Sequence, residues 1–220
     1  MTHRGAVVSY ADMRLYFVRH AESEANAAEV LASRMDFPLS ARGRADAEAL
    51  AAEFCPRTPR LTRIMASPLP RAQQTAAPFA RLTGLQVAID DRITEQHLGR
   101  YSGMSYDRIK SEPGYVHDRT RRWDWVPEGG GESYQMISER VEAFLRDLTP
   151  APADGETLIV THAVTMRLIH AVLARTLPSY PERIASNGEI WSVEFQKVGE
   201  RHEVEAVDLA ALQTIPAHRA

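Results

Sequence analysis

The sequence contains very little cysteine and very little lysine. Cys55 is the only cysteine among 220 residues, which excludes an intramolecular disulfide and any metal site built from several cysteines. We expect it to be a structural thiol at a helix end. Lys110 and Lys197 are the only lysines, so every other basic residue is an arginine. This abundance weakens any argument that depends on a single arginine.

Long apolar segments are also missing. No stretch approaches the roughly 18 apolar residues that a membrane span requires, and residues 1–14 lack the apolar core of a signal peptide. The formal net charge of -3 gives no overall attraction to nucleic acid or to an anionic membrane. We therefore expect a soluble, cytoplasmic protein whose partner is a small molecule. The sequence leaves the oligomeric state open, with a homodimer as one alternative.

The chain has enough apolar material for one core. Hydrophobic residues make up 44% of it and charged residues 25%, so we interpret residues 1–220 as a single domain with a tail over about 1–13. Strand-like runs alternate with helical patterns, which is typical of a mostly parallel sheet in a three-layer α/β/α sandwich. Pro78 predicts a kink or a break in the second helix. The expected strands are 15–18, 63–66, 86–89, 157–161 and 190–195, and the expected helices are 41–54, 70–82, 134–148 and 163–175.

Residues 101–131 differ in character from the rest. They hold Trp123, Trp125, two prolines and a run of three glycines, with only a short helical pattern. Such a segment is too long for a simple connection. We interpret it as a lid-like segment that faces the substrate, with an ordered surface loop as the alternative.

Polar side chains follow three of the expected strands. Arg19 and His20 come after the first, Ser67 and Arg71 after the second, and His162 after the fourth. Parallel α/β sheets bind ligands outside the carboxyl ends of their strands, where helix N-termini favour anions. These residues predict a cationic pocket, in which a histidine beside an arginine is a candidate nucleophile toward phosphate.

Six blocks, in order, resemble the histidine phosphatase superfamily, which includes the phosphoglycerate mutases. VRHAESEAN resembles the signature of arginine, histidine, glycine and glutamate, with Ala21 in the place of the glycine. ASPLPRAQQTA resembles the segment with the second arginine, and TEQHLGRYSG resembles the acid-bearing loop. DFPLSARGRADA, GGGES and VTHAVTMR match the remaining blocks. The resemblance covers about 15–195 and implies a phosphoglycerate mutase-like fold.

The resemblance implies a role for each residue of the pocket. His20 would attack the phosphoryl group and carry it as phosphohistidine, while Arg19, Arg71 and His162 would bind the transferring oxygens. Glu95 would protonate the leaving alkoxide and later activate water. The attacking imidazole nitrogen must be neutral, so we predict that the other ring nitrogen of His20 donates a hydrogen bond to a nearby carbonyl or side chain. Arginines and histidines supply the charge that magnesium supplies elsewhere, so we expect no metal and no cofactor.

Five further residues are candidates for the edge of the site. Asn26 is either a phosphate or substrate ligand or a helix-turn cap, and the two alternatives have equal weight. Residues 32–35 read Ala-Ser-Arg-Met where many family members have a glycine followed by an aromatic residue, and Arg34 is a candidate substrate contact. Arg121 and Arg122 resemble an arginine pair that mutases use on a distal phosphate; the alternative is a solvated cluster that packs on the nearby tryptophans. Asn187 is a candidate substrate contact. The remaining histidines lack the spacing of metal ligands, and we interpret them as structural or surface residues.

The residues after Glu95 favour a phosphatase over a mutase. Mutases that resemble this chain have a second basic patch at the positions that Gln96, Leu98 and Tyr106 occupy here. Residues 186–188 read Ser-Asn-Gly, as in phosphatases. We therefore expect a phosphomonoesterase that acts on small phosphorylated metabolites. The alternatives are a cofactor-dependent phosphoglycerate mutase and, in another class, a non-catalytic phospho-ligand-binding protein. The binder is disfavoured because the full catalytic set is present.

Overall fold

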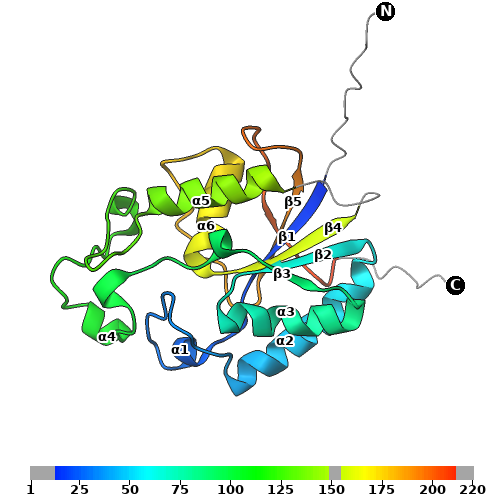
Figure 1. Cartoon of the computed structure of the whole chain (residues 1–220), viewed down its shortest axis with the longest axis horizontal. Helices are drawn as coiled ribbons and strands as arrows, with labels where there is room; N and C mark the ends of the chain where they lie inside the picture. The colour runs from blue at the N-terminus through cyan, green and yellow to red at the C-terminus, as the bar shows by residue number, and fades with distance from the viewer. Residues whose placement is uncertain (1–12, 149–154, 212–220) are drawn as a thin grey trace, which may run out of the picture.

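The computed structural model describes residues 13–148 and 155–211, so residues 1–12 of the expected tail lie outside the described residues. Its centre is a six-stranded sheet in the order β3-β2-β4-β1-β5-β6 (Figure 1). The first four of these strands are parallel, and β5 and β6 are antiparallel to their neighbours. The mostly parallel α/β prediction is confirmed. The strands are β1 (Met13–Arg19), β2 (Leu61–Ala66), β3 (Val87–Ile89), β4 (Glu156–Thr161), β5 (Ile190–Phe195) and β6 (Glu205–Ala206).

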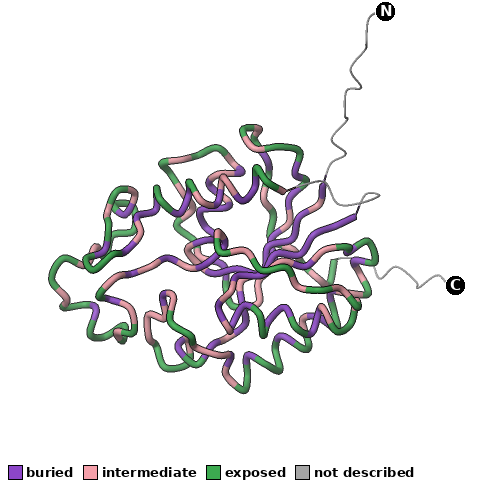
Figure 2. Tube along the Cα trace, viewed as in Figure 1, coloured by how far each residue is buried: buried purple, intermediate pink, exposed green. Residues whose placement is uncertain are grey.

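Two pairs of helices cover the two faces of the sheet. α2 (Ala41–Phe54) and α3 (Pro70–Thr83) lie on one side, and α5 (Tyr134–Asp147) and α6 (Ala163–Ala174) lie on the other (Figure 1). Side chains of β1 alternate between these layers: Leu15 joins the core under α5 and α6, and Tyr16 joins the core under α2 and α3. Figure 2 shows the central strands β1 and β4 mostly buried and the helices exposed on their outer sides, while the edge strands β3 and β6 are more exposed. Each helix thus stabilises the sheet through one apolar face.

The helix boundaries follow local chemistry with one exception. Ser40 and Ser133 cap α2 and α5 through their side-chain oxygens, as predicted. α6 stops one residue earlier than expected because Arg175 is left-handed, at a φ of 56°. The predicted break at Pro78 is wrong, since α3 continues to its glycine cap. Pro78 removes one backbone donor, but the buried side of α3 still packs against the sheet.

Glycine allows α2 to approach the loop that follows β1. A Cβ atom at Gly43 would lie 1.9 Å from the carbonyl oxygen of Glu22. The carboxylate of Glu22 accepts a hydrogen bond from the hydroxyl of Ser40 at 2.7 Å. Glu22 therefore has a structural role, and it fixes the loop after β1 against the start of α2.

The segment 101–131 folds as short turns around an aromatic cluster. The ring of Tyr101 contacts those of Tyr115 and Trp125, at centroid distances of 5.2 and 6.0 Å.

Every helix within residues 13–148 and 155–211 is too short or too polar to span a membrane. The shorter helices are α1 (Glu24–Ala27), η1 (Cys55–Arg57), η2 (Asp91–Ile93), η3 (Gly99–Tyr101), α4 (Tyr106–Ile109) and η4 (Arg119–Arg121).

Candidate active site

The carboxyl ends of three neighbouring strands meet at one cavity. β4 lies between β1 and β2, and Arg19 pairs in register with Thr161, so the residues that follow β1 and β4 are neighbours. The rings of His20 and His162 have centroids 5.1 Å apart. The cavity measures about 590 Å³, and its lining includes Arg19, His20, Arg71 and Glu95. The structure thus brings the predicted pocket residues together.

His20 has the geometry of a neutral nucleophile. Its ring is buried, and its Nδ1 lies 2.7 Å from the carbonyl oxygen of Ala21. A carbonyl oxygen can only accept, so Nδ1 donates and Nε2 keeps its lone pair. Burial, followed by the charges of Arg71 and Arg19, lowers the pKa of His20 well below its ordinary value. The predicted hydrogen bond is present, and the ring is neutral at physiological pH.

Both arginines of the pocket are oriented by backbone carbonyl oxygens. Arg19 Nη1 donates to Ala185 at 2.6 Å, while Arg71 donates through Nη1 to Met35 at 3.0 Å and through Nη2 to Ser33 at 2.7 Å. The Nε atoms of both arginines are buried without a hydrogen-bond partner in the described part of the chain. Unpaired buried donors are costly, so these atoms indicate a site for an anion.

His162 lies behind His20 at the start of α6. It is fully buried, and its Nε2 lies 2.7 Å from the hydroxyl oxygen of Ser67. Burial is the main cause that lowers the pKa of His162 well below its ordinary value, and the charge of Arg71 adds to it. Its Nδ1 has no hydrogen-bond partner among residues 13–148 and 155–211. His162 is therefore held by Ser67 with one ring nitrogen unpaired, and it lies outside the set of residues that line the cavity.

The carboxylate of Glu95 sits on the N-terminus of α6. The backbone N–H groups of Val164 and Thr165 donate to its two oxygens at 3.3 Å, and that of Gln96 donates at 2.9 Å. The Thr165 hydroxyl lies 3.4 Å from the same carboxylate. Glu95 is thus fixed at the cavity wall by the helix that His162 begins.

Asn26 and Asn187 lie together at the edge of the site. Asn26 completes a capping box with Ser23 at the start of α1 and also lines the cavity, so the cap is present and the role as a ligand stays a prediction. The amide of Asn187 donates to the carbonyl oxygen of His20 at 2.9 Å and to Asn26 at 3.2 Å. Asn187 is not part of the cavity lining. Its contacts support the loop of His20 rather than a substrate.

The three remaining candidate arginines have three different positions. Arg122 lines the cavity, whereas Arg121 is exposed and does not. The two residues therefore do not line the cavity as a pair. The guanidinium of Arg34 contacts the carboxylate of Glu132 at 2.7 Å and lies outside the cavity lining, which differs from the expected substrate contact.

Residues from the segment 101–131 form the outer wall of the cavity. Lys110, Tyr115, His117 and Arg119 line it, and sequence reasoning assigned none of them to the site. His117 was expected to be structural or on the surface. The unusual length of this segment was the only signal that it faces the site. Its position there agrees with the substrate-facing interpretation.

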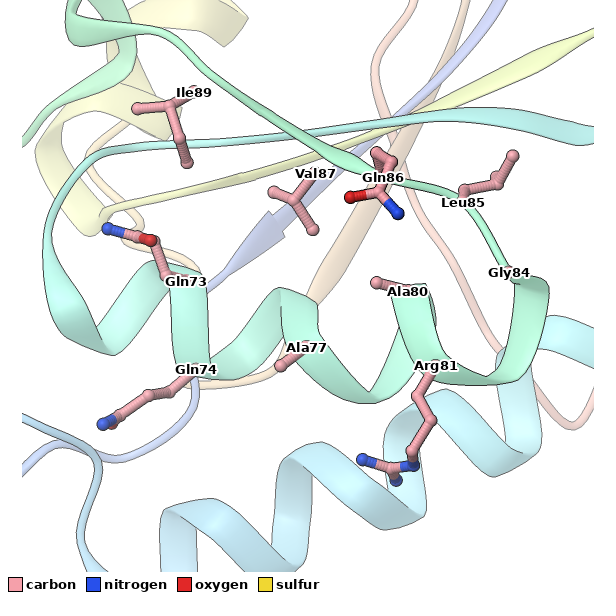
Figure 3. Close-up of a pocket in the computed structure, with 10 residues that line it drawn as sticks. All are labelled: Gln73, Gln74, Ala77, Ala80, Arg81, Gly84, Leu85, Gln86, Val87 and Ile89. Atoms are coloured by element: carbon pink, nitrogen blue, oxygen red, sulfur yellow. The ribbon is translucent and has the colours of Figure 1, made fainter.

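A second hollow lies at the edge of the sheet, away from His20. It is a groove of about 710 Å³ between α3 and β3, and Figure 3 shows its glutamines, small side chains and one arginine. The lining contains no histidine, cysteine or carboxylate. Unlike the cavity at His20, this groove lacks both a nucleophile and an acid. The described residues also contain no cluster of three side chains suited to holding a metal ion.

The buried neutral histidines predict a loss of stability in acid. Unfolded histidines titrate near pH 6.5, while His20 and His162 stay neutral to lower pH in the folded chain. The unfolded chain therefore binds more protons below that pH, and the free energy of unfolding falls as the pH falls. Between pH 6.5 and the lower pKa of the folded state, each histidine reduces the free energy of unfolding by about 1.4 kcal/mol for every pH unit of acidification. Above pH 6.5 it makes no such contribution. Urea unfolding at pH 4.5 to 7.5 should give a flatter profile for the double variant His20→Asn, His162→Asn. If the free energy of unfolding of the double variant fell with pH as steeply as that of the unaltered chain, the prediction would be wrong.

A neutral histidine beside two arginines whose Nε donors are unpaired in the described residues, at the carboxyl end of a parallel sheet, is an arrangement suited to phosphoryl transfer. The model of the histidine phosphatase superfamily, branch 1, matches residues 15–207, and the chain is an enzyme of this superfamily. Phosphoserine phosphatase 1 of Hydrogenobacter thermophilus is 34% identical over 165 residues, which are 73% of this chain and 76% of that protein. A probable phosphoglycerate mutase GpmB of an Enterobacter species is 32% identical over 173 residues, or 78% and 79%.

The solved structures give the same picture of the fold. A mycobacterial glucosyl-3-phosphoglycerate phosphatase complexed with VO3 has a TM-score of 0.77 and 25% identity, over 89% of this chain and 98% of that one. A putative alpha-ribazole-5'-P phosphatase from Escherichia coli has a TM-score of 0.74 at 23% identity, over 90% and 97%. The architecture of this chain is thus that of known phosphatases.

Proposed function

We propose that the protein is a phosphomonoesterase that hydrolyses small phosphorylated metabolites through a phosphohistidine on His20. The observation that carries this proposal is the neutral ring of His20, held by the Ala21 carbonyl between two arginines that have unpaired donors. In the first step, Nε2 forms a bond to phosphorus and the ester P–O bond breaks. Glu95 gives its proton to the departing alkoxide.

The second step returns the enzyme to its starting state. Glu95, now a carboxylate, takes a proton from water as the water oxygen attacks phosphorus and the N–P bond breaks. Inorganic phosphate leaves, and the histidine is again neutral. Arg19, Arg71 and His162 would bind the non-bridging oxygens in both steps, where charge on the phosphoryl group must be stabilised.

Hydrolysis is favoured over transfer back to a sugar acid. The positions of the second basic patch of mutases hold Gln96, Leu98 and Tyr106, all of which line the cavity. None of these side chains carries the positive charge that a bisphosphorylated intermediate requires. Relatives of both kinds exist, a phosphoserine phosphatase and a probable phosphoglycerate mutase, and this feature of the lining supports the phosphatase.

Arg122 supports a substrate with a second anionic group. Its side chain is only 6% exposed, its guanidinium lies 4.8 Å from the ring centroid of Tyr115 and 5.3 Å from that of Trp125, and its Nε donates to Val116. No carboxylate in the described residues forms an ion pair with Arg122, which lines the same cavity as His20. A buried guanidinium stacked in this way is preorganised for a carboxylate or phosphate. The substrates named for two relatives, phosphoserine and glucosyl-3-phosphoglycerate, each carry a carboxylate.

Replacing Arg122 should separate substrates by their distal charge. For Arg122→Gln we expect kcat/KM to fall about 10- to 100-fold on phosphate esters with a carboxylate, since a hydrogen bond to a charged group contributes about 1.5–3 kcal/mol. Esters without a second anion should be affected far less. Arg121→Gln is the matched control, because Arg121 is exposed next to it. Equal losses on both substrate groups would contradict the distal contact.

A panel of phosphate esters tests the proposed function. Phosphoserine, sugar phosphates, 3-phosphoglycerate and a phosphopeptide are incubated with the protein, with and without a chelator. Release of inorganic phosphate that survives the chelator is the expected result. Interconversion of phosphoglycerates that depends on a bisphosphate primer would instead identify a mutase. Binding without turnover would identify a phospho-ligand-binding protein.

A further inference from the structure

A charged cluster outside the cavity holds the peptide that carries Glu95. The carboxylate of Glu132 contacts Arg34 Nη2 at 2.7 Å and Arg140 Nε at 3.1 Å. Both arginines also donate to the backbone carbonyl of Glu95, Arg34 through Nε at 3.1 Å and Arg140 through Nη2 at 3.4 Å. One carboxylate therefore fixes two guanidinium groups, and these fix the backbone of the proposed general acid.

Glu132 also holds the next two residues of this peptide. Its carboxylate accepts the N–H of His97 at 3.0 Å, its own N–H donates to the His97 carbonyl at 2.8 Å, and its carbonyl accepts the side-chain amide of Gln96 at 2.8 Å. Burial raises the pKa of Glu132, but the charges of Arg140 and Arg34 and the N–H of His97 lower it below its usual value. The side chains of Glu132 and Arg140 are 14% and 15% exposed, so water screens their charges only partly.

Arg34 belongs to a segment that supports both sides of the reaction. The flanking carbonyl oxygens of Ser33 and Met35 accept the two hydrogen bonds of Arg71. Ser33 is buried at a φ of 50°, and its hydroxyl donates to the carbonyl of Gln96 at 2.9 Å. A residue in this left-handed conformation persists where its surroundings over-determine it. The segment 33–35 is thus a rigid link between the phosphate-binding arginine and the loop of Glu95.

We propose that Arg34 and Glu132 are positioning residues that hold Glu95 at the distance from which it protonates the leaving group. Neither side chain lines the cavity, so they act through Glu95 and not on the substrate. This inference rests on the proposed function, in which Glu95 is the general acid. A displacement of about 1 Å at a reacting group can cost on the order of 100-fold in rate, so a loosened peptide would slow proton transfer.

The test compares two leaving groups in the first turnover. An alkyl phosphate such as glycerol phosphate needs a proton on its leaving oxygen, whereas nitrophenyl phosphate barely needs one. For Arg34→Gln and for Glu132→Gln we expect the first-turnover rate on the alkyl ester to fall about tenfold relative to the rate on the nitrophenyl ester. In the Glu95→Gln background, the further change Arg34→Gln should have almost no effect on this ratio. Inhibition by inorganic phosphate should stay within about twofold, because the acceptors of Arg71 are backbone carbonyls.

The controls distinguish this inference from the function on which it rests. Arg81→Gln removes an exposed ion pair with Glu48, between α3 and α2, and should leave both rates unchanged. Equal losses on both esters, or a full additional loss in the Glu95→Gln background, would overturn the positioning role alone. An unaltered chain without turnover, or a Glu95→Gln variant that slows both first turnovers equally, would overturn the proposed function and this inference with it. Thermal unfolding of each variant reports any general loss of structure, which would slow both esters together.

Discussion

Replacing His20 with alanine is expected to lower kcat on every phosphate ester by about 10⁴-fold or more, the order seen when a catalytic nucleophile is removed. The variant deletes the only group in the cavity that is proposed to form a bond to phosphorus. Arg19 and Arg71 remain oriented by backbone carbonyls, so binding of inorganic phosphate should survive. Rapid mixing of the unaltered enzyme with radiolabelled substrate, followed by alkaline denaturation, should retain the label on the protein, since an N–P bond is acid-labile. His20→Ala should retain none.

A second histidine variant controls for general damage. His170 lies on α6 and packs edge-on against Trp191, with ring centroids 5.7 Å apart, outside the cavity lining. His170→Gln should keep both the label and turnover. Comparable activity in His20→Ala would contradict the phosphohistidine proposal, because no other residue in the proposed mechanism forms a bond to phosphorus.

Replacing Glu95 with glutamine is expected to separate the two chemical steps. First turnover of an alkyl phosphate should slow by about 10²- to 10⁴-fold, the usual contribution of a general acid. First turnover of nitrophenyl phosphate should change little, because its leaving group is stable without a proton. Water activation in the second step should still be slow, so this ester should give a burst of nitrophenol followed by a low steady rate.

A neighbouring carboxylate, Asp91, provides the control for the Glu95→Gln result. Asp91 is exposed four residues before Glu95, and Asp91→Asn should show neither the selective loss nor the burst. Glutamine keeps one oxygen for the N–H groups at the start of α6, so the loop should hold its place. If both esters slowed equally in the first turnover, Glu95 would not be the acid.

The positions of His20 and His162 could be predicted because each follows a strand at once. Adjacent parallel strands bring their carboxyl ends to the same edge, and the pairing of Arg19 with Thr161 places the two histidines side by side. The orientation of His20 followed from chemistry alone, since a reactive imidazole nitrogen requires a donor bond from the other one. These inferences needed only the strand ends and the residue types.

The contacts of Arg34 and Arg122 could not be predicted in the same way. Arg34 was expected at the substrate, yet its partner Glu132 is distant in sequence and meets it only because the segment 101–131 folds back beside Glu95. Arg121 and Arg122 are adjacent in sequence, but a short turn exposes one and buries the other against Tyr115. The helix through Pro78 shows the same limit, since packing against the sheet overrides a local preference. Tertiary contacts decided each of these cases.

The anchoring of Arg19 and Arg71 by backbone oxygens has a consequence for how this site tolerates change. A neutral carbonyl orients a guanidinium without cancelling its charge, so both arginines present their full positive charge to a phosphoryl group. The anchors are backbone oxygens, so Met35 and Ala185 hold the arginines without their side chains, whereas the hydroxyl of Ser33 also helps to fix the path of the chain. Substitutions there that preserve the backbone leave the phosphate cradle intact. Substrate preference can therefore diversify along these loops without dismantling the chemistry.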